Sequence, residues 1–361
     1  MKKKKIALIT GITGQDGSYL LDFLLSKKYK VHGIKRKSSQ FNSGLIDHVI
    51  NNNKIYNKSF FMHYGDLTDS LSLTKIIQKV KPDEIYNLAA QSHVKVSFDN
   101  PEYTSNVNAL GTLRLLESVK LLGLEKKIKI YQASTSEMFG GLLNSKLNEK
   151  SPFYPRSPYA ISKLYSYWIC KNYREAYGMF ICNGILFNHE SKRRGETFLT
   201  RKITQGFAKI LCSKQSFIEI GNLYSKRDWG HAKDYVEMQW LMMQKNKPDD
   251  YVIATGKQYS IKEFIDLCAN YCGIKIKWIG KGLLEKGVVY KKSKDLKIKL
   301  NLGDVIIKVN KKYFRPTEVS NLLGDSSKAR KKLNWKPKTN INNLIKEMID
   351  SDLLSIKNKI N

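Results

Sequence analysis

The stretch LITGITGQDGSYL, residues 8–20, decides the fold. It places Gly11, Gly14 and Gly17 at three-residue spacing, after a strand-like run and before a helical run. Glycines at such a junction allow a tight turn and bring backbone N–H groups, at the positive end of a helix, against a pyrophosphate. The alternative is a glycine-rich turn with no ligand. The position of the motif favours a dinucleotide-binding loop made of Gly11, Thr13, Gly14, Gln15, Asp16 and Gly17.

Strand-like and helix-like runs alternate through the first half of the chain. The strand-like runs are residues 5–10, 30–35, 59–67, 83–90 and 127–136, and amphipathic stretches separate most of them. This βαβα order predicts an α/β fold with a doubly wound parallel Rossmann sheet. The second half is less regular, with a loop-rich basic region up to residue 310 and a small helical cap at the end. We expect a Rossmann domain at 1–190 and a smaller α/β substrate lobe at 191–361, interleaved with the first.

The formal charge of +31 raises the question of nucleic acid. Of the 63 basic residues, 10 are arginine and 53 are lysine, and the lysines are spread along the whole chain. No helix-turn-helix, zinc-finger or aromatic RNA-binding signature is present. The arginines instead cluster in motif segments, and arginine suits bidentate phosphate binding. We therefore predict a phosphate-bearing small ligand and no nucleic acid.

The chain lacks the long apolar run of a membrane helix, and its start is too short in apolar residues for a secretory signal. We therefore expect a cytoplasmic protein. Five cysteines without paired spacing suggest no disulfide framework. Cys268 and Cys272 lie one helical turn apart and are interpreted as core residues, so no metal site is predicted.

The ends of later strands indicate the cofactor. The second strand runs into GIKRKSS, and Arg36 and Ser38 suit the 2′-phosphate of NADP better than an acidic residue would. A solvated basic loop is the alternative. We expect Asp66 and Leu67 to flank the adenine. The segment after the fourth strand would contact the rest of the dinucleotide through Leu88, Ala89, Ala90, Gln91 and Ser92.

RSPYAISKLY holds Tyr159 and Lys163 on one face of a helix, which we expect to begin at Ser157 and Pro158. A lysine ammonium near a tyrosine lowers the phenol pKa. The phenolate can then accept a proton from a substrate hydroxyl as hydride leaves for a nicotinamide. Two residues four apart occur often by chance, so the prediction depends on the glycine loop as well.

The glycine loop, the Tyr–Lys pair and the segment YQASTSEMFG, residues 131–140, resemble the extended short-chain dehydrogenase/reductase superfamily. The resemblance implies that Thr135 hydrogen-bonds the reacting oxygen. Glu137 is the informative residue, because epimerases and reductases of this class need no acid there. A carboxylate beside Thr135 and Tyr159 can remove a proton next to a new ketone and permit loss of water. A surface carboxylate at a loop start is the alternative.

The chain resembles the GDP-mannose 4,6-dehydratase family from its start to about residue 350. The resemblance rests on GITGQDGSYL, VHGIKR, HYGDLTD, PDEIYNLAAQSHV, STSE, PFYPRSPYA, NGILFNHES, RRGETFLTRKIT, RDWGHAKDYV, YVIATG and YFRPTEV. It weakens across residues 285–302. Ala89, Met138 and Phe139 depart from the family pattern without removing a reactive group.

The resemblance implies a lyase that converts GDP-mannose to GDP-4-keto-6-deoxymannose and water by internal hydride transfer through tightly bound NADP, the first step toward sugars such as GDP-fucose. It places Thr135, Glu137, Tyr159 and Lys163 in catalysis. Cofactor contacts would include Tyr103, Lys163, His189 and Arg194. Substrate contacts would come from Ser92, Thr135, Glu137, Tyr159, Asn188, Lys202, Arg227, Arg315 and Glu318. A homo-oligomer, tetramer or dimer, is also implied.

Three other readings stay open at this point. The chain could be a nucleotide-sugar epimerase or reductase on the same fold. It could be a basic nucleic-acid-binding protein, or an NADP-binding regulatory protein without activity. The intact set of Thr135, Glu137, Tyr159 and Lys163 argues against the last of these.

Overall fold

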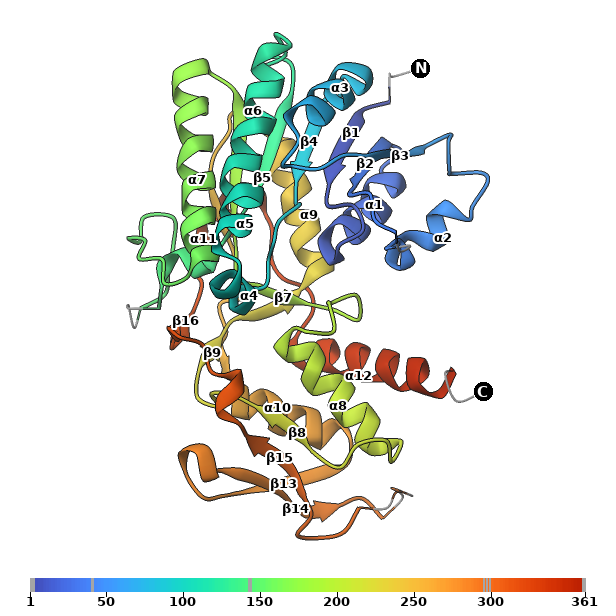
Figure 1. Cartoon of the computed structure of the whole chain (residues 1–361), viewed down its shortest axis with the longest axis vertical. Helices are drawn as coiled ribbons and strands as arrows, with labels where there is room; N and C mark the ends of the chain where they lie inside the picture. Colours follow the sequence, from blue (N-terminus) through green and yellow to red (C-terminus); the bar gives the residue numbers. More distant parts are fainter. Residues whose placement is uncertain are drawn as a thin grey trace.

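The computed structural model describes residues 4–39, 42–141, 145–294, 296, 298 and 300–358. A seven-stranded parallel sheet in the order β11-β6-β5-β4-β1-β2-β3 forms the centre of the larger lobe (Figure 1). The predicted doubly wound fold is confirmed. The strands are β1 (Ile6–Thr10), β2 (Lys30–Lys35), β3 (Phe60–Tyr64), β4 (Glu84–Asn87), β5 (Lys129–Thr135), β6 (Phe180–Leu186) and β11 (Tyr251–Ile253).

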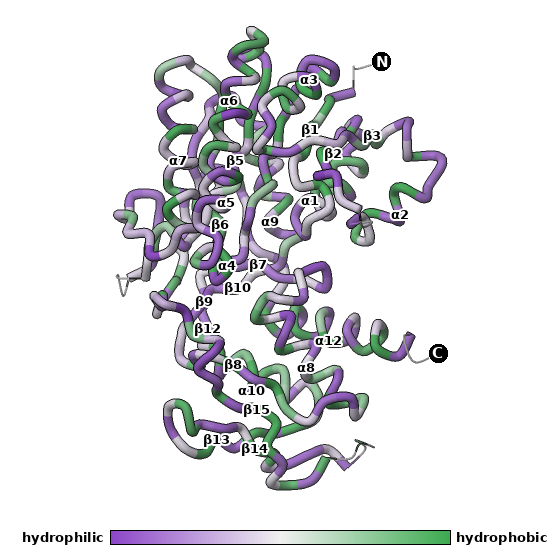
Figure 2. The backbone as a smooth tube through the Cα atoms, in the orientation of Figure 1, coloured by the Kyte–Doolittle hydropathy of each residue, from purple (hydrophilic) through white to green (hydrophobic). Residues whose placement is uncertain are grey.

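Helices cover both faces of this sheet because each strand sends alternate side chains to opposite sides. In β1, Ala7 and Ile9 join the core under one helical layer, whereas Leu8 joins the core on the other side. Green and purple alternate along α7 (Figure 2), as expected for a helix with one buried face. One layer contains α1 (Gln15–Ser26) and α9 (Ala232–Met243), and the other contains α3 (Ser70–Val80), α6 (Gly111–Leu121) and α7 (Pro158–Tyr177).

The start of α7 matches the prediction. The Ser157 hydroxyl accepts the backbone N–H of Ala160 at 3.1 Å, and Pro158 occupies the first turn. The helix ends at Gly178, whose φ of 59° lies in the left-handed region. This start fixes Tyr159 in the first turn of the helix, next to the end of β5.

The smaller lobe is built on the four-stranded sheet β13-β14-β15-β8. Its apolar core lies between this sheet and three helices. α12 packs on α8 and α10 and forms the predicted helical end of the chain. The elements are β8 (Ile218–Ile220), β13 (Ile274–Ile279), β14 (Lys286–Lys292), β15 (Val305–Val309), α8 (Leu199–Leu211), α10 (Ile261–Tyr271) and α12 (Ile341–Asn358).

The prediction of a loop-rich basic region up to residue 310 is wrong. Residues 274–309 contain three strands of this sheet. Val289 and Ile307 are buried in the lobe's core, while Lys286 and Lys308 are exposed. The lysines therefore occupy the solvent side of an alternating pattern, which the high lysine content of the segment conceals.

Short elements connect the lobes, and α9, β11 and α11 return the second half of the chain to the larger lobe. Cys268 and Cys272 are buried in the core of the smaller lobe, as predicted. No helix among the described residues is long and apolar enough to span a membrane. The short elements are η1 (Gly44–Ile46), α2 (Asp47–Ile50), α4 (Val94–Asp99), α5 (Pro101–Ser105), η2 (Asn106–Leu110), η3 (Ser136–Phe139), β7 (Asn188–Glu190), β9 (Lys226–Arg227), β10 (Trp229–His231), β12 (Tyr259–Ser260), η4 (Gly282–Leu284), η5 (Lys311–Tyr313), β16 (Asn321–Leu322) and α11 (Ser327–Leu333).

A buried ion pair links α7 to the sheet and gives a stability prediction. Both carboxylate oxygens of Asp250 accept from Arg174 Nη2 at 2.8 Å, and Oδ1 also accepts the backbone N–H of Asn183. Asp250→Ala leaves the largely buried Arg174 guanidinium unpaired, so we expect a loss of about 3 kcal/mol in the free energy of unfolding. Asp350→Ala removes the partner of exposed Lys346 and should cost less than about 1 kcal/mol. Equal losses in urea titrations of the two variants would contradict this account.

Candidate active site

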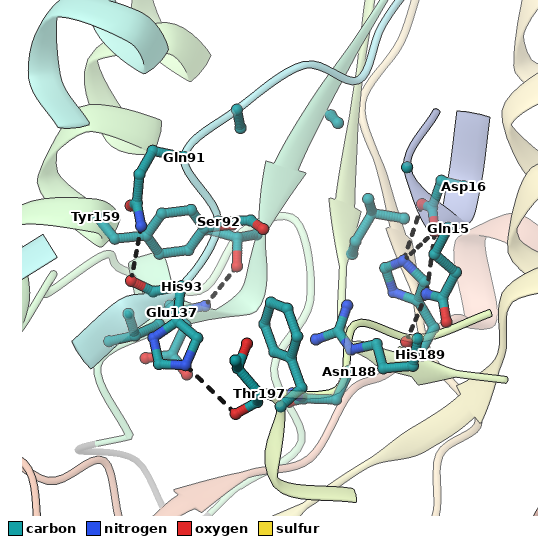
Figure 3. Close-up of a pocket in the computed structure, with 18 of the residues that line it drawn as sticks. Gln15, Asp16, Gln91, Ser92, His93, Glu137, Tyr159, Asn188, His189 and Thr197 are labelled. Carbon is teal, nitrogen blue, oxygen red and sulfur yellow. Dashed lines mark hydrogen bonds and ion pairs between the residues drawn. The ribbon is translucent and has the colours of Figure 1, made fainter. Parts of the chain in front are cut away.

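One cavity of about 880 Å³ opens between the two lobes, at the carboxyl ends of the parallel strands. Parallel sheets of this kind bind ligands at these ends, where the strand order reverses between β1 and β4. Every predicted site residue lines the cavity except Ser38, which is described but is not part of the lining. Figure 3 shows residues from both predicted groups facing this space.

The glycine loop runs between β1 and α1 and lies directly against the end of β4. Gly11 has a φ of +70°, and a Cβ there would lie 2.9 Å from the backbone N and Cα of Ala89. A Cβ on Gly17 would lie 2.3 Å from the carbonyl oxygen of Gly11. Gly14 caps α1 without a side-chain hydrogen bond, so the first N–H groups of the helix have no side-chain cap. These features suit close approach of a pyrophosphate.

Two contacts fix the neighbouring strand ends. Thr10 Oγ1 donates to Asn87 Oδ1 at 2.7 Å and accepts the backbone N–H groups of Leu88 and Ala89. After β2, Arg36 Nη1 donates to the Tyr103 hydroxyl at 2.6 Å. The structure thus brings together Arg36 and Tyr103, which are distant in sequence.

Thr135 ends β5 in an extended conformation, and its hydroxyl accepts the backbone N–H of Glu137 at 3.3 Å. This turn places the Glu137 side chain, with the residue 7% exposed, in the same cavity as Tyr159. Burial raises the pKa of Tyr159 to about 12, although a hydrogen bond with Thr135 acts in the opposite direction. The Glu137 charge raises the Tyr159 pKa further.

Lys163 lies one turn after Tyr159, and its Nζ donates to the carbonyl oxygen of Ala133 at 2.9 Å. Burial lowers the pKa of Lys163 to about 8. The expected lowering of the Tyr159 pKa is not seen, because burial of the phenol is the largest influence on it and raises that pKa. Lys163 instead fastens α7 to β5.

The far side of the cavity carries the arginines of the smaller lobe and its linkers. Arg227 is buried and its Nη1 donates to the carbonyl oxygen of Val319 at 2.8 Å, while burial lowers its pKa. Arg315 Nη1 lies 3.6 Å from Glu137 Oε1. The Glu318 carboxylate accepts the backbone N–H of Arg315 at 3.0 Å. Lys202 Nζ lies 3.1 Å from the centre of the Tyr313 ring.

Several lining residues were not predicted as site residues. His93 and Phe198 pack together with ring centres 5.3 Å apart, and the His93 ring nitrogen faces the carbonyl oxygen of Thr197. Tyr313 and Trp229 lie in the segments YFRPTEV and RDWGHAKDYV. Because these two residues lie close in sequence to Arg315 and Arg227, their position could have marked them as site residues. Further unpredicted residues of the lining include Lys95, Ile220, Asn222, Ser225 and Ile261.

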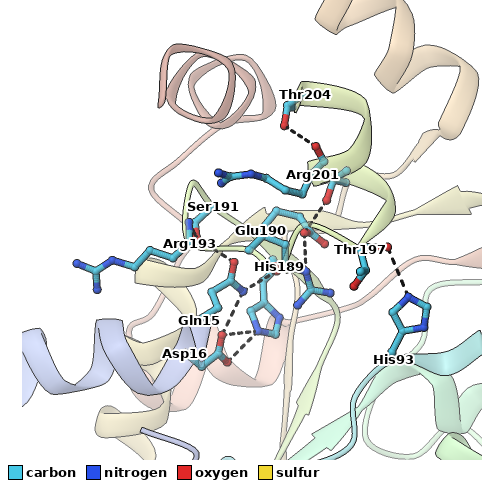
Figure 4. A network of polar contacts seen from close by, with 12 residues as sticks. Gln15, Asp16, His93, His189, Glu190, Ser191, Arg193, Thr197, Arg201 and Thr204 are labelled. Carbon is cyan, nitrogen blue, oxygen red and sulfur yellow. Dashed lines mark hydrogen bonds and ion pairs between the residues drawn. The ribbon is translucent and has the colours of Figure 1, made fainter. Parts of the chain in front are cut away.

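A largely buried ion pair joins the glycine loop to β7, as Figure 4 shows. His189 Nε2 lies 2.8 Å from Asp16 Oδ2, and Nδ1 lies 2.8 Å from the carbonyl oxygen of Phe187. Burial opposes both charges, but their mutual attraction outweighs it, so the pKa of Asp16 is lowered and that of His189 is raised. Gln15 adds a hydrogen bond to the carbonyl oxygen of His189. Both polar atoms of the imidazole are therefore used within the protein.

The glycine loop, the parallel sheet and the Thr–Tyr–Lys set at the end of β5 define an enzyme of the extended short-chain dehydrogenase/reductase class. Residues 8–348 match the family described as GDP-mannose 4,6 dehydratase, and the chain belongs to this family.

Similar proteins agree with this assignment. A GDP-mannose 4,6-dehydratase of Vibrio cholerae is 57% identical over 353 residues, which cover 98% of this chain and 94% of the relative. That of Drosophila melanogaster is 54% identical and covers 99% of this chain and 89% of the relative. The solved dTDP-glucose 4,6-dehydratase DesIV of Streptomyces venezuelae, with NAD and TYD bound, has a TM-score of 0.77 at 19% identity and covers 98% of each chain. That structure shares the fold.

The Asp16–His189 pair predicts a particular dependence of stability on pH. The Asp16 pKa lies below its ordinary 3.8, so its contribution exists above that pH and is lost as pH falls. The His189 pKa lies above its ordinary 6.5, so its contribution is full below 6.5 and is lost as pH rises through the folded-state pKa. Asp16→Asn should therefore cost most, about 3 kcal/mol, between about pH 4 and 6.5.

Urea unfolding of the native protein and of Asp16→Asn at pH 5, 7 and 9 measures this difference. Asp250→Asn is the matched control, because Asp250 pairs with Arg174, which stays charged throughout. If the loss in the free energy of unfolding caused by Asp16→Asn grows from pH 5 to pH 9, Asp16 is not paired with a protonated His189.

Proposed function

We propose that this chain is a lyase that converts GDP-mannose to GDP-4-keto-6-deoxymannose and water, using tightly bound NADP that is regenerated in each cycle. Family membership across residues 8–348 supports the substrate and the reaction. The single observation that carries the mechanism is the place of Glu137. Its carboxylate shares one cavity with Thr135, Tyr159 and the glycine loop.

The residues present fit a nicotinamide dinucleotide. Gly11 and Gly17 keep clear the space that a Cβ would fill, and the start of α1 lacks a side-chain cap. Solved neighbours of the same fold carry such cofactors, including RMD of Pseudomonas aeruginosa complexed with NADPH, at a TM-score of 0.73. The preference for NADP is inferred from Arg36, which follows β2 and offers a guanidinium where NAD-specific sites usually have an acid. Ser38 is assigned to the 2′-phosphate of NADP from its position in the sequence alone.

The remaining predicted cofactor residues follow from position in the cavity. Asp66 and Leu67 are assigned to the adenine end, and the segment 88–92 to the middle of the dinucleotide. Tyr103 is assigned with Arg36, to which it is hydrogen-bonded. His189 and Arg194 line the inner part of the cavity. Because both ring nitrogens of His189 are bonded within the protein, its contact with the cofactor would be made by the face of the ring.

A nicotinamide held by these residues would supply the hydride chemistry, oxidation at carbon 4 of the sugar and reduction at carbon 6. The phenol of Tyr159 exchanges the proton of the carbon-4 hydroxyl, and the Thr135 hydroxyl orients that oxygen. The ammonium of Lys163, one turn after Tyr159 on the same helix, is assigned to favour the phenolate during this exchange.

Glu137 performs the step that makes this a dehydratase. The carbon-4 ketone acidifies the hydrogen on carbon 5, and the Glu137 carboxylate removes it as a proton. That proton is delivered to the departing carbon-6 hydroxyl, which leaves as water. Glu137 takes up a new proton from solvent and supplies it to carbon 5 as carbon 6 is reduced, while Tyr159 releases the carbon-4 proton to solvent. Atoms and electrons balance, and no external reductant is consumed.

The smaller lobe is assigned to the GDP moiety, with residues 1–190 holding the cofactor and 191–361 mainly the substrate. Arg227 and Arg315 suit the diphosphate because guanidinium groups bind phosphate oxygens in pairs. Asn188, Lys202, Glu318 and Ser92 line the space between the arginines and the catalytic groups. A homo-oligomer, dimer or tetramer, remains a prediction from the family resemblance.

Glu137→Gln separates this function from that of an epimerase or reductase on the same fold. The amide cannot take up the carbon-5 proton, so we expect water loss from GDP-mannose to fall at least about 100-fold. Incorporation of solvent deuterium at carbon 5 should fall with it, while NADP released on denaturation stays equal to that of the native enzyme. Glu237→Gln, on the outer side of α9, is the control for a Glu-to-Gln change. Unchanged turnover in the Glu137 variant would defeat the assignment.

A further inference from the structure

The contact between Glu137 and Arg315 joins the two lobes at the reacting centre. Glu137 belongs to η3, at the end of β5, whereas Arg315 follows η5 and lies between β15 and β16. Their charged atoms, Oε1 and Nη1, are 3.6 Å apart. This distance is an ion-pair contact, too long for a hydrogen bond. The base proposed for the carbon-5 proton is therefore paired with a cation that is proposed to bind the diphosphate.

The two arginines of this region differ in how firmly they are held. Arg227 Nη1 donates to the carbonyl oxygens of Lys226 and Val319, at 2.9 and 2.8 Å, and its side chain is buried. The Arg315 side chain is 29% exposed, and its Nη1 is buried without a hydrogen-bond partner. Arg227 is thus fixed by the backbone, and Arg315 is held by the Glu137 charge.

A diphosphate can bind the Arg315 guanidinium more strongly than the Glu137 carboxylate does. Bidentate hydrogen bonds between a guanidinium and phosphate are short and charge-assisted, and they are stronger than a loose ion pair. Glu318 does not compete for the guanidinium in the same way, because its Oε1 accepts the backbone N–H of Arg315. Moving the Arg315 guanidinium from carboxylate to phosphate would leave Glu137 Oε1 free to face the sugar.

We propose that Arg315 is exchanged between two partners: it pairs with Glu137 in the free enzyme, and the diphosphate of the bound substrate takes it away and so releases the carboxylate for proton transfer. This inference rests on the proposed function. Under this exchange, Glu137 can act as the general base only when the nucleotide diphosphate is bound. Glu137 and the diphosphate then compete for the Arg315 guanidinium.

Competition predicts that removal of the Glu137 charge tightens binding of GDP, a ligand without the sugar. We expect Glu137→Gln to lower the dissociation constant for GDP about three- to tenfold, measured by titration calorimetry at fixed ionic strength. In the Arg315→Ala background, the same Glu137→Gln change should have no effect. Guanosine, which has no phosphate, should bind the native enzyme and Glu137→Gln equally.

Two outcomes would overturn the proposal. A gain in GDP affinity from Glu137→Gln that persists in the Arg315→Ala background would mean plain repulsion between the Glu137 carboxylate and phosphate. If Glu137→Gln does not tighten GDP binding in any background, Glu137 does not hold Arg315. If instead the native enzyme bound no GDP at all, the proposed substrate class would be wrong, which distinguishes the two failures.

Discussion

Parallel pairing of the central strands is the constraint on which the site depends. Because β1, β2, β4, β5 and β6 all run in one direction, their carboxyl ends meet at one edge of the sheet. Residues as distant in sequence as Gly11, Thr135 and His189 are brought into one cavity in this way. The smaller lobe covers that edge, and Arg227 and Arg315 line the cavity on its side.

Two charge pairs of different kinds lie in this cavity. Asp16 is paired with His189 at the glycine loop, and Glu137 with Arg315 at the reacting centre. The first pair is largely buried and short, so it holds β7 against α1 as a fixed part of the structure. The second is longer and partly exposed, so a charged ligand can replace it. This difference separates the charges that build the site from the charges that respond to substrate.

The sequence predicted the sheet, and it marked the residues that the structure brings together in the cavity, because both depend on local signals. The apolar runs and glycine spacing marked β1 and α1, and Ser157 with Pro158 marked the start of α7. It missed the strands β13 to β15, because lysines on their exposed faces imitate a loop. It also predicted the wrong direction for the pKa of Tyr159, since desolvation depends on packing from distant segments. The Glu137–Arg315 contact spans 178 positions and carried no local signal.

Internal return of one hydride to the same sugar is the central claim of this account. GDP-mannose deuterated at carbon 4 can be incubated with the purified protein and NADP, and the sugar nucleotide followed by mass spectrometry, with UDP-glucose and dTDP-glucose in parallel. We predict that GDP-mannose alone loses one water and that its product keeps the deuterium, now on carbon 6, without accumulation of NADPH. Deuterium found in free NADPH, its loss to solvent, or dehydration of another nucleotide sugar instead would contradict the account.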